Sequence, residues 1–134
     1  MSALTDIGTY LAAASISTQD LTLGTNLFLG RLPDSPDTCV GLIQTGGVAP
    51  IDTFGTSFPP LEVPSLQTLI RASSYATSES LAIDIFKSLS AVENATLTST
   101  LYLKIEAEQS PFPVERDRQE RVIFSCNYSI VKAI

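Results

Sequence analysis

The chain has 134 residues, a length that fits one ordinary domain over residues 1–134 with a single core. It carries 8 Lys and Arg against 14 Asp and Glu, and the resulting formal net charge of −6 excludes a protein that holds nucleic acid by neutralising its phosphates. Only 16% of the residues are charged, below the roughly 25% of typical soluble domains. The neutral surface is explained either by burial against other copies of the chain or by solvation of the many Ser and Thr residues.

The N-terminal segment and the two cysteines bear on where the protein works. The first 15 residues lack a cationic start and include Asp6, so we expect no signal peptide, and no run of 18 apolar residues predicts a membrane span. Cys39 and Cys126 have no CxxC partner, and we interpret both as small apolar residues on strands. A disulfide between them is the less favoured alternative, because no secretion signal is present.

The N-terminal half begins with one helical pattern. Over residues 3–16, apolar side chains recur at intervals of three and four, which predicts a helix that Ser2 could cap. Residues 27–29 and 38–45 are short apolar runs between turn residues, and each predicts a strand. The Gly- and Pro-rich stretch 46–64 has no periodicity, so we expect a long loop there.

The C-terminal half predicts a strand, a helix and two further strands. These are a strand over 65–72, a helix over about 77–92 capped by Thr77 or Ser78, and strands over 99–107 and 121–131, with a loop over 108–121. On the last two strands the alternation places Leu103 and Phe124 on the core face, with Ile85 of the helix packed against them.

The order of these elements, α-β-β-β-α-β-β, has no βαβ repetition. It favours an α+β fold in which an antiparallel or mixed sheet of four to five strands packs on two helices.

The sequence contains no set of residues typical of a catalytic, cofactor-binding or metal-binding site. The chain has no histidine, which removes the commonest general base and the usual partner of a nucleophile, and neither a GxSxG elbow nor a GK[ST] phosphate loop occurs. Asp34 and Asp37 are the best carboxylate pair, but a hard cation needs six or more oxygens, so we favour a proline turn with Asx caps. We therefore expect no enzyme and no cofactor.

A dense mixed-charge cluster runs from Glu115 to Arg121. Such a run at a loop tip is either a solvated turn or a contact in which arginine forks meet the carboxylates of a neighbouring subunit. Three of the five arginines of the chain, Arg116, Arg118 and Arg121, are found here, and this concentration strengthens the interface hypothesis.

Three stretches together resemble the bacteriophage minor capsid and tail terminator family. They are GTNLFLGRLPDSPDTCVGLIQTGGVAP, PSLQTLIRASSYATSESLAIDIFKSL and SPFPVERDRQERVIFSCNYSIV, and they span nearly the whole chain. Each motif alone is weak, and their order and spacing carry the resemblance. The alternatives are a head-completion or minor capsid protein at the head–tail joint, and a small protein-binding module.

The resemblance implies a non-enzymatic virion protein that assembles in the host cytoplasm. It implies a homo-oligomer, a hexameric ring, which closes the head-proximal end of the tail tube, contacts the tube protein and docks to the neck or connector. DNA would pass through without specific binding, in keeping with the acidic balance, and no membrane is involved.

Closed rings join one surface patch to a different patch on the next subunit, and the two expected loops, 46–64 and 108–121, are chemically unlike. The candidate interface residues are Arg116, Asp117, Arg118, Arg121, Gly46, Gly47, Pro50, Phe54 and Phe58.

Overall fold

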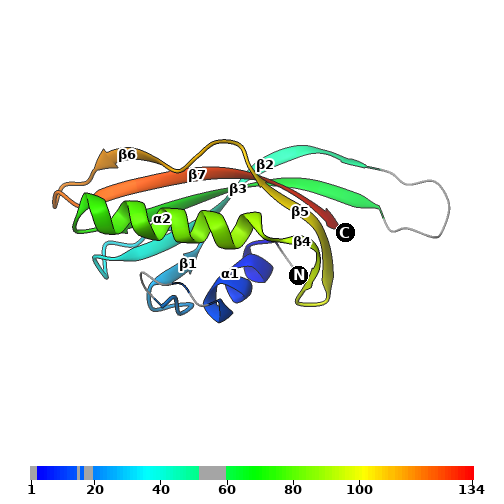
Figure 1. The fold of residues 1–134 in the computed structure, drawn as a ribbon, viewed down its shortest axis with the longest axis horizontal. Coiled ribbons are helices and arrows are strands. Elements are labelled where there is room, and N and C mark those ends of the chain that lie inside the picture. The colour runs from blue at the N-terminus through cyan, green and yellow to red at the C-terminus, as the bar shows by residue number, and fades with distance from the viewer. Residues whose placement is uncertain (1–2, 15, 17–19, 52–59) are drawn as a thin grey trace.

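The computed structural model describes residues 3–14, 16, 20–51 and 60–134. Within these ranges the chain forms two helices and seven strands (Figure 1). In chain order they are α1 (Ala3–Ala13), β1 (Leu27–Leu29), β2 (Cys39–Ile51), β3 (Leu61–Ala72), α2 (Tyr75–Ser90), β4 (Glu93–Leu97), β5 (Thr100–Ala107), β6 (Phe112–Arg116) and β7 (Val122–Ala133). Neither described helix is long and apolar enough to cross a membrane.

One mixed sheet contains all seven strands, in the order β1-β2-β3-β7-β5-β4, with β6 paired beside β5 on the same edge of β7. The β1–β2 pair is parallel and the other pairs are antiparallel. Both helices lie on one face of the sheet, with α2 packed on β3, β5 and β7 and α1 on β1, β2 and β4 (Figure 1). The mixed α+β class is confirmed. The expected count of four to five strands and the element order are wrong, because β4 and β6 were not predicted.

The core lies between the sheet and the helices. Phe124 and Ile85 are buried in it as predicted, but Leu103 is only half-buried. The register of β5 against β7 shifts between Tyr102 and Lys104, so that two residues of β5 advance against one of β7. Such a bulge reverses the alternation. Tyr102 and Ile105 therefore face the core, and the prediction for Leu103 is wrong.

Helix α2 begins two residues earlier than the sequence indicated. Ser74 is the N-cap, and its hydroxyl oxygen accepts a hydrogen bond from the backbone N–H of Thr77 at 3.2 Å. Neither Thr77 nor Ser78 is therefore the cap. One face of the helix, with Leu81, Ile85 and Leu89, is fully buried, which confirms the predicted burial of Ile85.

Residues 46–51 and 61–64 of the expected loop are strand and not loop, while residues 52–59 lie outside the described residues. We define residues 44–51 of β2 and 61–64 of β3 as the arm. The two strands pair through Gly47 with Pro64, Val48 with Val63 and Ile51 with Leu61, with register shifts on either side of the Gly47–Val48 pairs. The arm extends away from the helices along the long axis of the molecule (Figure 1). Gly46, Gly47 and Pro50 are accommodated at these irregularities, where the ladder is interrupted.

Strands β4 and β6 complete the sheet at its other edge. β4 joins β5 through a two-residue turn in which Thr98 and Ser99 both have positive φ, as a tight hairpin turn requires. β6 lies within the expected loop 108–121 and pairs with β7, with a register shift between Pro113 and Glu115. The prediction of an unpaired loop there is wrong for residues 112–116.

Candidate functional site

The mixed-charge cluster comprises the end of β6 and the turn to β7, and one of its arginines is buried. Arg121 is 4% exposed, and its guanidinium donates to the carboxylate of Asp117 at 2.7 Å and to that of Asp37 at 3.1 Å. It also donates to the backbone carbonyl of Asp34. These bonds lie within one chain, so Arg121 holds the turn of its own subunit, and its side chain is not free for a neighbour.

Asp117 shapes the same turn. One of its carboxylate oxygens accepts the backbone N–H groups of Gln119 and Arg121, each at 2.9 Å. Burial acts to raise the pKa of Asp117, but the hydrogen bonds from Arg121 and Gln119 and the charge of Arg121 outweigh it, so the pKa lies below its usual value. The two remaining arginines of the cluster, Arg116 and Arg118, are exposed, and Arg116 donates a hydrogen bond to the backbone carbonyl of Glu120 at 3.1 Å.

The Asp34–Asp37 segment is the turn against which Arg121 packs. Arg71, which is also buried, donates to the carbonyls of Pro36 and Asp37 at 2.7 and 3.2 Å. Arg71 of β3 and Arg121 of the β6–β7 turn thus hold this segment, in agreement with the turn interpretation. Among the residues that the structure describes, no group of three or more His, Cys, Asp and Glu side chains is placed to hold a metal ion.

Both cysteines are free, buried and on strands, as predicted. Cys39 on β2 accepts a hydrogen bond from Arg71 at 3.1 Å. Burial raises the pKa of each thiol. For Cys39 the charges of Arg71 and Arg121 oppose that rise without cancelling it. Neither thiol is suited to act as a nucleophile, because the reactive species is the thiolate.

The arm contains three of the sequence-predicted interface residues. Gly46, Gly47 and Pro50 are all exposed there, whereas Phe54 and Phe58 lie outside the described residues. Gly47 is required by geometry, because a Cβ added to it would lie 2.3 Å from the carbonyl oxygen of Val63. The arm also exposes Val48 and Ile51, which sequence reasoning overlooked.

A hollow of about 360 Å³ lies at the opposite end of the molecule, between the start of α2 and β6. It is lined by Tyr75, Pro113, Val114, Glu115, Arg116 and Val122. The ring of Tyr75 packs edge-on against Phe124 of the core, with ring centroids 5.1 Å apart. Tyr75, Phe112 and Val114 are exposed. Phe112 and Val114, two residues apart just before the charged cluster, were the available signal for this apolar surface.

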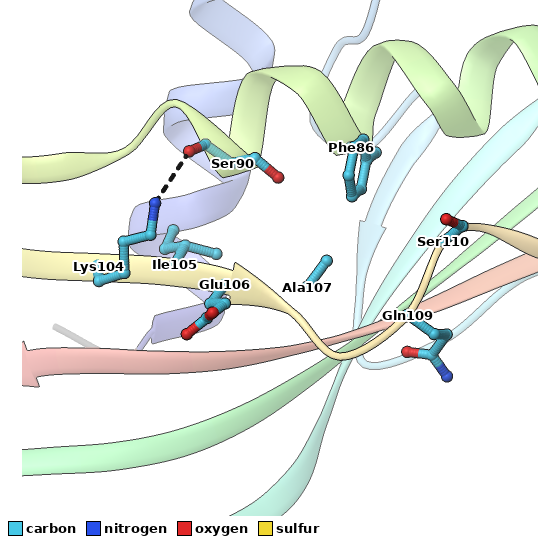
Figure 2. A pocket seen from close by; sticks show the side chains of 8 residues that line it. All are labelled: Phe86, Ser90, Lys104, Ile105, Glu106, Ala107, Gln109 and Ser110. Carbon is cyan, nitrogen blue, oxygen red and sulfur yellow. Dashed lines mark hydrogen bonds between the residues drawn. The ribbon is translucent and has the colours of Figure 1, made fainter.

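A second hollow, also of about 360 Å³, lies between α2 and β5. Figure 2 shows Phe86 pointing from the helix toward Ala107, and Lys104 reaching the backbone carbonyl of Ser90, to which it donates at 3.4 Å. The eight lining residues include two serines but no cysteine, and the chain has no histidine that could activate a serine. This hollow carries no catalytic arrangement.

The comparisons with known proteins agree with the resemblance seen in the sequence. No curated protein sequence matches the chain. A solved structure described as the virion of a native gene transfer agent particle contains a chain of the same fold. Its TM-score is 0.72, its sequence identity is 12%, and the alignment covers 99% of this chain and 96% of that one. The family model described as bacteriophage tail terminator protein matches residues 11–134. The chain therefore belongs to the bacteriophage tail terminator family, whose members are structural proteins of the virion.

Proposed function

We propose that the protein forms a closed homo-oligomeric ring, hexameric as the resemblance implies, that caps the head-proximal end of a phage tail tube. The observation that supports a ring is the position of its two candidate surfaces. The arm and the β6–β7 turn lie at opposite ends of the long axis (Figure 1). Unlike surfaces at opposite ends join copies head to tail, and such contacts generate rings when the rotation closes.

In this proposal the exposed arginines of the β6–β7 turn, Arg116 and Arg118, face carboxylates of the next subunit. Gly46, Gly47 and Pro50 belong to the arm, at the other end. Asp117 contributes by fixing the turn and not by touching the neighbour, since its carboxylate is bonded within its own chain. Asp117 therefore fixes the conformation of the turn beside which Arg116 and Arg118 are exposed.

The remaining parts of the proposal follow from the family and the charge. A structural ring needs no enzymatic activity and no cofactor. The net charge of −6 suits a channel through which DNA passes without specific binding. The partners are further copies of the chain, the tail tube protein and the neck or connector. Assembly takes place in the host cytoplasm, and the product is part of the virion.

The first experiment is a mass measurement on the purified protein, alone and mixed with tube protein. We expect a discrete closed oligomer in at least one of the two samples. A protein that stays monomeric in both, and leaves tube length uncontrolled, would contradict the proposal.

The second experiment tests the turn. Reversing both exposed arginines, Arg116→Glu with Arg118→Glu, should abolish ring closure while the melting temperature changes little, because exposed charges contribute little to stability. In a phage, the expected phenotype is tails of uncontrolled length or tails that fail to join heads. The matched control is Lys87→Glu, another exposed cation, on α2. Normal rings from the double variant would show that the turn is merely solvated.

A further inference from the structure

The described part of the arm ends in an apolar surface with no charge of its own. Val48 is 70% exposed, and Ile51 is exposed beside it, in a stretch from Gln44 to Ile51 that contains no charged residue. We call Val48 and Ile51 the arm patch. Their cross-strand partners Val63 and Leu61 are half-buried and support the two side chains from β3. Exposed aliphatic side chains held on a paired strand are suited to a contact with another surface.

The hollow at the other end of the molecule has several apolar lining residues. Its walls are the ring of Tyr75, Pro113 and Val114, which is 50% exposed, with Val122 beneath. The contact with Phe124 fixes the ring of Tyr75, so that this wall is in place before anything binds. We call this the end hollow. Arg116 lies on its rim, and Arg118 follows in the same turn.

We propose that the arm patch of one copy of this chain seats in the end hollow of the next copy. The two surfaces match in chemistry, since aliphatic side chains meet an apolar hollow with an aromatic wall. Charge does not oppose the contact. The described arm has no cation, and its one acid, Glu62, is paired with Lys132 of its own chain, while the hollow is lined by one residue of each sign, Glu115 and Arg116. The arm patch and the end hollow lie at opposite ends of the long axis of the molecule (Figure 1). Each copy therefore contacts one neighbour through its arm and another neighbour through its hollow.

This inference rests on the proposed function, because it needs copies of the chain to associate. It adds the identity of the two surfaces and the direction of the contact. The proposed contact is not symmetric, because in a symmetric contact the arm of one copy would meet the arm of the other. A head-to-tail contact leaves one unused arm and one unused hollow on any open assembly, and this property can be tested.

The test uses two variants, each blocked at one surface. Val48→Lys puts a cation on the arm patch, and Val114→Lys puts one in the end hollow. Both positions are exposed, so both variants should keep the melting temperature and circular dichroism of the parent. Ile83→Lys is the matched control, since Ile83 is an exposed apolar residue on α2, outside both surfaces. Native mass spectrometry and sedimentation velocity report the assemblies.

We expect each blocked variant to lose the ring at concentrations where the parent and Ile83→Lys are fully assembled. Mixing the two blocked variants should then restore one good contact, between the intact arm of Val114→Lys and the intact hollow of Val48→Lys. The mixture should form a 1:1 dimer and nothing larger, because the only surfaces left over are the two that carry lysine.

Two results would overturn the inference and leave the ring proposal intact. One is a normal ring from either blocked variant. The other is a mixture that stays monomeric, which would show that the two surfaces do not meet each other. A parent protein that never assembles, with or without tube protein, would instead refute the proposed function itself.

Discussion

Replacing Phe124 by alanine tests both the core and the wall of the end hollow. Phe124 is 1% exposed and lies on the core face of β7, opposite Ile70 of β3. Its ring meets that of Tyr75 at 5.1 Å with an interplanar angle of 70°, a favourable edge-to-face geometry. The substitution therefore leaves a cavity in the core and removes the support of Tyr75.

The expected cost is large compared with the stability of a domain. Truncating a buried phenylalanine to alanine lowers the free energy of unfolding by about 3–5 kcal/mol. For 134 residues, an unfolding entropy of about 2.1 cal/mol/K per residue gives about 0.28 kcal/mol/K. Dividing the cost by this entropy predicts that the melting temperature falls by about 11–18 °C.

Thermal unfolding followed by circular dichroism measures this shift, and urea titration gives the free energy independently. Phe112→Ala is the matched control, because Phe112 is the same residue type on the neighbouring strand β6 but is 37% exposed. Equal melting temperatures for the two variants would refute the assignment of the core face of β7. Near-native rings from a stable Phe124→Ala protein would show that the position of Tyr75 does not matter to assembly.

Two further predictions concern buried and bonded polar groups. Tyr102→Phe removes the hydroxyl that donates to the buried carboxylate of Asp6 at 2.8 Å, and we expect it to lower the free energy of unfolding by about 1–3 kcal/mol in urea titration. An unchanged midpoint would contradict this. Asp117 has a pKa lowered in the folded state, so its contribution to stability is present above its unfolded pKa of about 3.9 and is lost as the pH falls through the folded value. The melting temperature of Asp117→Asn should therefore fall less steeply below about pH 4 than that of the parent. The same pH dependence of the melting temperature in both proteins would show that the bonds of Asp117 to Arg121 do not stabilise the fold.

The elements that could be predicted from sequence are those in which one face is buried along a regular repeat. The stripe of α2 and the alternation of β7 are direct consequences of packing against a core, and both place Ile85 and Phe124 correctly. Strand β5 has the same kind of alternation, but one extra residue near Leu103 reverses it. The position of a bulge is not visible in the hydrophobic pattern, so it cannot be predicted from sequence periodicity.

The strands of the arm and β6 were expected to be loops, for a related reason. Glycine and proline signal a turn in most contexts, yet in an exposed hairpin or an edge strand the same residues are tolerated where the ladder is interrupted. The candidate site shows a similar limit. Arg118 and Arg121 are alike in sequence, and only the fold separates them, because Asp37, which binds Arg121, lies 84 residues away along the chain.

The cations of the chain are divided between the interior of the fold and the surface beside the end hollow. Three of the eight cations, Arg71, Arg121 and Lys132, are buried and bonded within the chain. Two of them, Arg121 and Lys132, are ion-paired with carboxylates of their own chain, those of Asp37, Asp117 and Glu62. The exposed cations are Arg31, Lys87, Arg116 and Arg118, so that two of the four lie in the turn beside the end hollow. The same turn exposes the acids Glu115 and Glu120, so charge alone does not disfavour a symmetric contact between two such ends. A contact between this end and the arm of another copy meets a surface whose one acid, Glu62, is paired with Lys132 of its own chain. Apolar complementarity between the arm patch and the end hollow therefore favours the head-to-tail order, which is the order that a ring requires.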